Sequence, residues 1–122
     1  MKFASIFVLA AAAAILATPE AVAGSKPQTF NAVVNFDGTL ARGRGATGAF
    51  HDGPGVYDVD FTRDVSACAY TASIGEAGSL GTSEPGTVTV VGRSGTPKGL
   101  YIQTFDKKGH AEDLAFHLIL AC

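Results

Sequence analysis

The sequence predicts an all-β fold, an antiparallel β-sandwich or jelly roll of about seven to eight short strands with one disulfide. Three observations predict this class. Short segments that alternate apolar and polar side chains recur at a spacing of roughly ten residues. All 15 glycines and four of the five prolines follow residue 23, mostly between those segments. No stretch after residue 23 has the length and 3.6-residue period of an amphipathic helix.

Residues 1–23 are predicted to be a secretory signal peptide and not part of the fold. Lys2 is the charged residue of a short n-region, residues 3–17 form an apolar or small run, and an A-x-A cleavage pattern ends at Ala23. The run is shorter than the ~20 residues that span a bilayer, so no retained membrane anchor is expected. Cleavage leaves a single domain of 99 residues (122 − 23), residues 24–122, in a secreted or periplasmic location.

The net charge of −2 does not favour binding to nucleic acid or to an acidic membrane surface. Removing residues 1–23 removes one lysine and one glutamate, so the charge is the same for the mature chain. Nucleic acid is therefore not an expected partner.

The first two predicted strands form a hairpin. Over residues 29–36 apolar side chains recur at every second position and end with Phe36. This alternation predicts a strand with those side chains on one face. Asp37-Gly38 is a strong signal for a tight turn. The expected partner strand is residues 39–42.

A second hairpin is expected between residues 46–51 and residues 56–61, joined by a turn at residues 52–55. The second strand of this pair has the clearest alternation in the chain. Its aromatic and aliphatic side chains share one face, and Asp58 and Asp60 share the other. Two acids on one face predict that this face is solvated.

Further strands are predicted at residues 67–74, 87–91 and 100–105. In the first of these, Cys68 shares a face with larger apolar side chains, and the other face carries only small ones. The glycine-rich loop at residues 75–86 is long for a compact domain, and binding often occurs on such loops.

The last predicted strand, residues 115–122, carries Cys122 on a face with three large apolar side chains. Two cysteines in a short exported chain are most simply interpreted as one disulfide. We therefore expect a Cys68–Cys122 bond in the core that joins a middle strand to the last strand. A pair of free thiols is the alternative, but no C-x-x-C motif supports it.

Residues 43–48 match the pattern G-x-G-x-x-G. The dinucleotide-binding fingerprint needs a helix after the glycines, and residues 49–54 cannot begin one. We interpret the segment as a glycine-rich β connection and expect no cofactor. Arg42 and Arg44 are either contacts for an anion or a sugar acid or, more simply, solvated side chains.

No metal site is expected. Asp58 and Asp60, with Asp64 near, supply few of the roughly six to eight oxygens that Ca²⁺ takes. The three histidines show no spacing typical of metal ligands.

The alternative function is a small secreted hydrolase with a site near His117 or His51. Ser73 or Ser94 would supply the hydroxyl of a Ser-His-Asp set, yet no spacing selects them and no G-x-S-x-G elbow is present. We expect no catalytic residues and favour the interpretation that the chain is not an enzyme.

Four segments of the chain match a series of sequence patterns. Residues 55–75 match G-x-Y-x-V-x-F-x-R-D-V-S-x-C-A-Y-x-A-x-x-G, residues 85–92 match P-G-x-V-x-V-x-G, residues 99–104 match G-[VL]-[YF]-[IV]-x-T, and residues 116–122 match F-H-L-x-x-x-C. This series resembles small exported bacterial β-domain proteins that have no assigned activity. Similar strand patterns occur at the C-terminal ends of fibre-like and collagen-repeat proteins, where such domains would form trimers.

The expected function is thus an exported, non-enzymatic β-domain of unknown specific role, used for binding or for interaction at the cell surface or outside the cell. The expected partner is an unknown protein or a glycan. A homotrimer is the oligomer that the resemblance implies.

Overall fold

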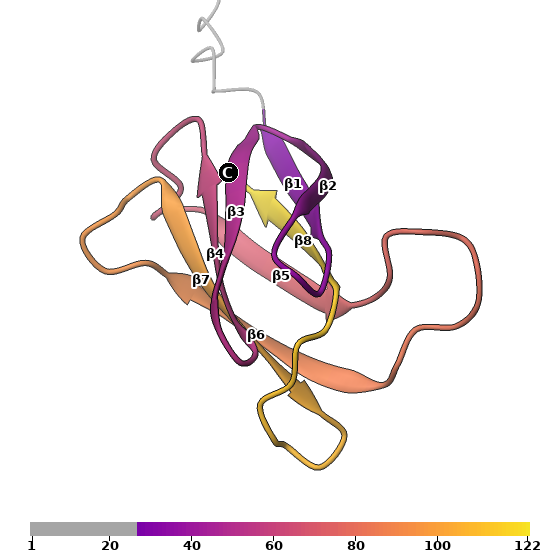
Figure 1. Ribbon diagram of the computed structural model, residues 1–122. Coiled ribbons are helices and arrows are strands. Elements are labelled where there is room, and N and C mark those ends of the chain that lie inside the picture. The colour runs from indigo at the N-terminus through magenta and orange to yellow at the C-terminus, as the bar shows by residue number, and fades with distance from the viewer. Residues whose placement is uncertain (1–26) are drawn as a thin grey trace, which may run out of the picture.

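The computed structural model describes residues 27–122, in which every regular element is a β-strand (Figure 1). The eight strands are β1 (Thr29–Val34), β2 (Leu40–Arg44), β3 (Ala46–Gly53), β4 (Val56–Phe61), β5 (Ala69–Ile74), β6 (Gly86–Gly92), β7 (Gly99–Asp106) and β8 (Phe116–Ala121). The predicted all-β class and the number of strands are therefore confirmed.

The strands form two four-stranded antiparallel sheets that pack as a sandwich. One sheet has the order β2-β1-β8-β5 and the other has the order β3-β4-β7-β6. The inward-facing side chains of both sheets form one apolar core. Its buried members are Ala32, Val34, Tyr57, Val59, Phe61, Val65, Leu100, Ile102, Phe116, Leu118 and Leu120.

Within residues 27–122, successive strands pair as the hairpins β1–β2, β3–β4 and β6–β7. The other connections pass from one sheet into the other. The predicted two-sheet sandwich is therefore confirmed.

The chain passes from one sheet into the other at Gly45. This residue lies between Arg44 of β2 and Ala46 of β3 and has φ = 77°. A Cβ at this position would collide with the ring of Phe30, which packs against the core. The positive φ and the close approach together require glycine. The segment at residues 43–48 is thus a glycine-rich β connection, as the sequence predicted.

Phe36 corrects the first predicted strand. β1 ends at Val34, and Phe36 lies in the turn before β2, where it is 60% exposed. The Asn35 backbone N–H donates to the Thr39 carbonyl at 2.9 Å, and the Thr39 N–H donates to Asp37 Oδ1 at 3.0 Å. Because these bonds close a turn, the strand alternation stops before Phe36.

The predicted Cys68–Cys122 disulfide is present, but it lies at the edge of the core, where Cys68 is half-buried and packs against the buried cluster. Cys68 directly precedes β5 and Cys122 directly follows β8, at the end of a ladder in which Ala69 lies opposite Ala121. The two Cα atoms are 4.3 Å apart, and Cys122 is exposed. Because β5 begins at Ala69 and β8 ends at Ala121, strand alternation does not determine which way either cysteine points. β5 is the fifth of the eight strands, as predicted, and it lies at the edge of its sheet.

The predicted signal peptide, residues 1–23, lies outside the described residues. Between residues 27 and 122 there is no helix long and apolar enough to cross a membrane.

Candidate functional site

The outer face of the β3-β4-β7-β6 sheet carries four side chains in one line across the strands. Phe50 of β3 lies opposite Asp58 of β4, Asp58 lies opposite Tyr101 of β7, and Tyr101 lies opposite Val91 of β6. These side chains point away from the core because their neighbours along β4 and β7 point into it. Phe50 is 52% exposed and Val91 is 57% exposed. We call these four residues the Phe50 row.

Asp58 and Asp60 lie on the outer face of the sheet, as predicted, but Asp58 itself is not solvated, because it is only 6% exposed. Burial, followed by a hydrogen bond with Asp52, raises the pKa of Asp58 to about 6. β3 has a register shift between His51 and Gly53, next to the turn into β4. Such a shift re-aims a side chain, and here it leaves Asp52 beside the Phe50 row.

Arg93 reaches across the sheet to two aspartates of β4. Its Nη2 is 3.5 Å from Asp58 Oδ2, and its Nη1 is 3.5 Å from Asp60 Oδ1. Gly99, which lies opposite Asp60 on β7, leaves room for this side chain. A Cβ at Gly99 would lie 3.1 Å from Arg93 Cδ and 3.0 Å from Asp60 Oδ1. A guanidinium therefore bridges two carboxylates directly beside the row.

An open hollow of about 500 Å³ adjoins Asp60 on this side of the sheet. Three of the side chains around it carry hydroxyl groups. The lining residues are Thr47, Asp60, Phe61, Thr62, Thr96 and Lys98. The row and the hollow together offer ring faces, hydroxyls, carboxylates and two cations, which are groups suited to non-covalent binding of a ligand.

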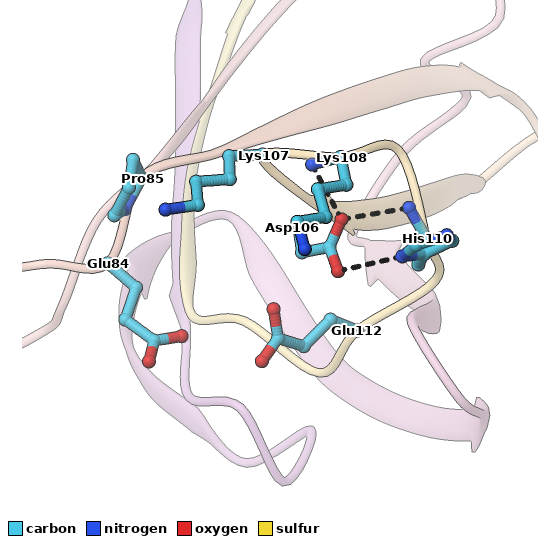
Figure 2. Close-up of a pocket in the computed structure, with 7 residues that line it drawn as sticks. All are labelled: Glu84, Pro85, Asp106, Lys107, Lys108, His110 and Glu112. Atoms are coloured by element: carbon cyan, nitrogen blue, oxygen red, sulfur yellow. Dashed lines mark hydrogen bonds and ion pairs between the residues drawn. The ribbon is translucent and has the colours of Figure 1, made fainter.

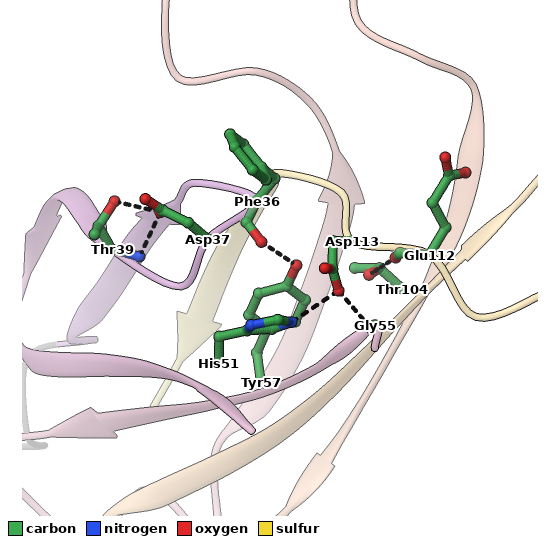
Figure 3. A network of polar contacts seen from close by, with 9 residues as sticks. All are labelled: Phe36, Asp37, Thr39, His51, Gly55, Tyr57, Thr104, Glu112 and Asp113. Atoms are coloured by element: carbon green, nitrogen blue, oxygen red, sulfur yellow. Dashed lines mark hydrogen bonds and ion pairs between the residues drawn. The ribbon is translucent and has the colours of Figure 1, made fainter. Parts of the chain in front are cut away.

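His51 belongs to a separate network (Figure 3). Its Nε2 is 2.8 Å from Asp113 Oδ1, which also accepts the Gly55 N–H at 2.7 Å. The bond from Gly55, with a further contribution from His51, holds the pKa of Asp113 below its usual range. The Tyr57 ring packs on the imidazole with centroids 5.1 Å apart, and its hydroxyl donates to the Phe36 carbonyl at 2.6 Å. These contacts connect the β1–β2 turn and the β3–β4 turn to the segment before β8.

The predicted alternative, a hydrolase, would need His51 or His117 to form a hydrogen bond with a hydroxyl group. In residues 27–122, no hydroxyl group is hydrogen-bonded to the His51 imidazole. His117 Nε2 is 3.0 Å from the Glu76 carbonyl oxygen. Ser73 lies opposite His117 in the ladder, but no hydrogen bond joins the two side chains, and Ser94 lies in the turn after β6. The geometry gives the hydrolase alternative no assembled nucleophile and base.

A polar hollow of about 370 Å³ lies between the end of loop 75–85 and the turn after β7 (Figure 2). It is lined by Glu84, Pro85, Asp106, Lys107, Lys108, His110 and Glu112. The Asp106 carboxylate accepts the backbone N–H groups of Lys108 and His110 at 2.8 and 2.9 Å. These two hydrogen bonds, of which the one from His110 has the larger effect, hold the pKa of Asp106 below its usual range. The Asp106 carboxylate therefore stabilises the turn in which it lies. The side chains around the hollow carry charges of both signs, which do not indicate a particular class of ligand.

The remaining candidate residues serve the local structure. Arg42 Nη1 donates to the Ala77 carbonyl at 2.8 Å, and Arg44 is exposed. Asp64 accepts the Ser66 N–H at 2.9 Å in the turn after β4. In the described part of the chain, no group of three His, Cys, Asp or Glu side chains could hold a metal ion.

The Phe50 row was not predicted. Phe50 lay in a predicted strand with no assigned role, and the face that carries Asp58 was expected to be solvated. No local pattern joins residues from four strands, because the row depends on which strands pair and in which register.

Comparison of the chain with protein-family models, curated proteins and solved structures finds no match. The resemblance to small exported bacterial β-domain proteins therefore stays a prediction.

Proposed function

We propose that this chain is an exported, non-enzymatic β-domain that binds a glycan through the Phe50 row. The observation that carries the proposal is the row itself: two exposed apolar side chains, Phe50 and Val91, in line with Tyr101 and a buried aspartate. Single exposed apolar side chains are common on protein surfaces. Here Phe50 and Val91 lie on the two edge strands and Tyr101 lies between them, so the row crosses the whole sheet. Export is supported by the pattern of residues 1–23 and by the disulfide, which persists in oxidising compartments.

The chemistry of this face favours a hydroxyl-rich ligand over a strongly charged one. Asp52, Asp58 and Asp60 face the cations of Arg93 and Lys98, so the local net charge is small. A small net charge does not steer a highly charged macromolecule to the surface. Carboxylate and guanidinium groups form charge-assisted hydrogen bonds with hydroxyls. Exposed aromatic rings supply the flat apolar surface on which a sugar ring packs.

The test is a glycan array probed with the purified exported protein, followed by calorimetric titration with a soluble glycan that binds. Phe50→Ser is expected to weaken binding about fivefold or more, because loss of an aromatic side chain that packs on a ligand typically costs more than about 1 kcal/mol. Ile119→Ser is the matched control, since Ile119 is equally exposed (52%) but lies on the outer face of the other sheet. Its affinity should equal that of the wild-type protein.

The proposal fails if no glycan binds, or if Phe50→Ser binds as tightly as the wild type. Binding that is confined to a protein component of the cell envelope, and that Phe50→Ser abolishes, would keep the site and replace the ligand class. Light scattering on the same samples tests the homotrimer.

A further inference from the structure

We propose that loop 75–85 is a site of limited proteolysis by an endoprotease that accepts Leu80, and that the cut protein persists as a two-chain, disulfide-linked form of the same fold. This inference goes beyond ligand binding and does not use the Phe50 row. It rests on the exposure of the loop, on the anchoring of its ends and on the position of the disulfide.

Loop 75–85 offers an unsupported stretch of chain with one large side chain at its midpoint. Leu80 is 92% exposed, and residues 78–85 are all exposed. Within residues 27–122, the backbone of residues 76–85 makes no hydrogen bond to another backbone group. Exposed loop tips of this kind, rich in small residues, are preferred sites of proteolytic nicking.

Both ends of the loop are held, so a cut between them leaves its surroundings in place. At the start, Arg42 Nη1 donates to the Ala77 carbonyl at 2.8 Å, and His117 Nε2 is 3.0 Å from the Glu76 carbonyl oxygen. At the far end, Gly86 begins β6 and lies so close to Leu114 that a Cβ would be 2.6 Å from its Cδ1. The accessible stretch is therefore confined to residues 78–85.

Two other exposed aromatic residues are poor substrates for the same kind of protease. Phe36 is exposed, but its turn is closed by the bond from Asn35 N–H to the Thr39 carbonyl. Phe50 is exposed, but its backbone belongs to β3, which pairs with β4. A protease must draw several residues into an extended conformation, and each of these segments would first have to unfold. Loop 75–85 needs no such unfolding.

The product remains one molecule. The protease adds water across the Leu80–Gly81 peptide bond, which creates a carboxylate on Leu80 and an amino group on Gly81, with no change in redox state. Cys68 lies before the cut and Cys122 lies after it, so the disulfide joins the two pieces. β8 of the second piece lies between β1 and β5 of the first, and β7 of the second piece pairs with β4 of the first. Each sheet therefore keeps strands from both pieces.

The test is limited digestion of the purified exported protein with chymotrypsin, whose hydrophobic specificity pocket accepts leucine. We expect a single cut after Leu80. Without reductant the mass should rise by one water and remain a single species. With reductant it should separate into a piece that ends at Leu80 and a piece that covers residues 81–122. The nicked protein should keep its β circular dichroism spectrum and a cooperative thermal transition.

Leu80→Ser is the control, because it removes the apolar side chain that chymotrypsin recognises and leaves the loop otherwise unchanged. It should slow the loop cut by about tenfold or more. Subtilisin, which has broad specificity, should still cut within residues 78–85 of this variant. A first cut elsewhere, for example after Phe36, would overturn the proposal. Loss of the circular dichroism spectrum on cutting, or a loop that resists both proteases, would also overturn it.

Discussion

The Asp58 carboxyl group is buried on the outer face of a sheet, between Phe50 of β3 and Tyr101 of β7. Burial raises its pKa to about 6 from the 3.8 of an unperturbed aspartate. Because the folded state holds this proton more tightly than the unfolded state, its contribution to stability is fully present below about pH 4. The contribution is lost as the pH rises through about 6.

Asp58→Asn should remove this pH dependence, since an amide keeps the shape of the side chain and does not ionise. We expect the free energy of unfolding of the variant, minus that of the wild type, to rise between about pH 4 and pH 7 by on the order of 1–3 kcal/mol. Urea unfolding at both pH values measures this difference. Taking the difference cancels the opposite contribution of Asp37, Asp64, Asp106 and Asp113, whose pKa values are lowered in the folded state.

Asp60→Asn is the control for this experiment, because Asp60 lies on the same face of β4 and pairs with the same Arg93. Its difference from the wild type should change less with pH. Equal differences at the two pH values for Asp58→Asn would contradict the assignment of a raised pKa to Asp58.

At the scale of elements, the corner between β2 and β3 decides how the two sheets are joined. β2 is an edge of one sheet and β3 is an edge of the other, and only Gly45 separates them. The corner brings the backbone against Phe30, whose ring in turn packs edge-on to Phe61, with centroids 6.4 Å apart. The sharp change of sheet is therefore coupled to the packing of the core.

Gly45→Ala should destabilise the fold by about 2 kcal/mol or more, because alanine is strained at this φ and its Cβ would collide with the Phe30 ring. Gly81→Ala is the matched control, since Gly81 has nearly the same φ (75°) but a Cβ there would meet nothing within 4 Å. It should cost about 1 kcal/mol. Denaturant unfolding of both variants measures the two costs, and equal costs would contradict the role of the Phe30 contact.

For the whole molecule, the disulfide closes a ring that contains β5 to β8. Cys68 and Cys122 are 54 residues apart, and a bond across a loop of that size stabilises the folded state by about 4 kcal/mol. Domains of this size have a total stability of roughly 5–10 kcal/mol. The disulfide links the two strands at the end of the β5–β8 ladder. At the same end, Gln28 and Cys122 form two backbone hydrogen bonds, of 3.4 and 2.9 Å.

The double variant Cys68→Ala/Cys122→Ala should therefore lose about 4 kcal/mol of stability and be only marginally folded. Urea unfolding compares it with the wild type, and the wild type measured in reductant should approach the variant. A loss of less than about 1 kcal/mol would show that strand pairing alone holds the end of the ladder.

Much of the strand pattern was predictable because alternation depends on residues that are close in sequence. The strand predicted at residues 56–61 coincides with β4. The first predicted strand is longer than β1, because Asn35 and Thr39 close a turn that alternation does not reveal. The strand predicted at residues 67–74 is longer than β5 for a similar reason: the Cys68 N–H donates to the Val65 carbonyl at 3.1 Å and belongs to the preceding turn.

The candidate site was not predictable in the same way. A regular hairpin around residues 52–55 would place Phe50 opposite Tyr57, on the core side of the sheet. The register shift between His51 and Gly53 instead pairs Phe50 with Asp58, on the outer side. A shift of one residue moves a side chain to the opposite face, and its energy depends on contacts with β4 and β7 that lie far away along the chain.

From the amino-acid sequence alone follow the all-β class, the approximate positions of eight strands and the pairing of the two cysteines. Each of these depends on side chains within a few residues of one another, or on the presence of two thiols in one short chain. The order of the strands, the burial of Asp58 and the alignment of Phe50 with Tyr101 and Val91 arise only when the sheets assemble. The physical reason is that a two-residue period specifies which face a side chain takes along its own strand, but not which strand lies beside it.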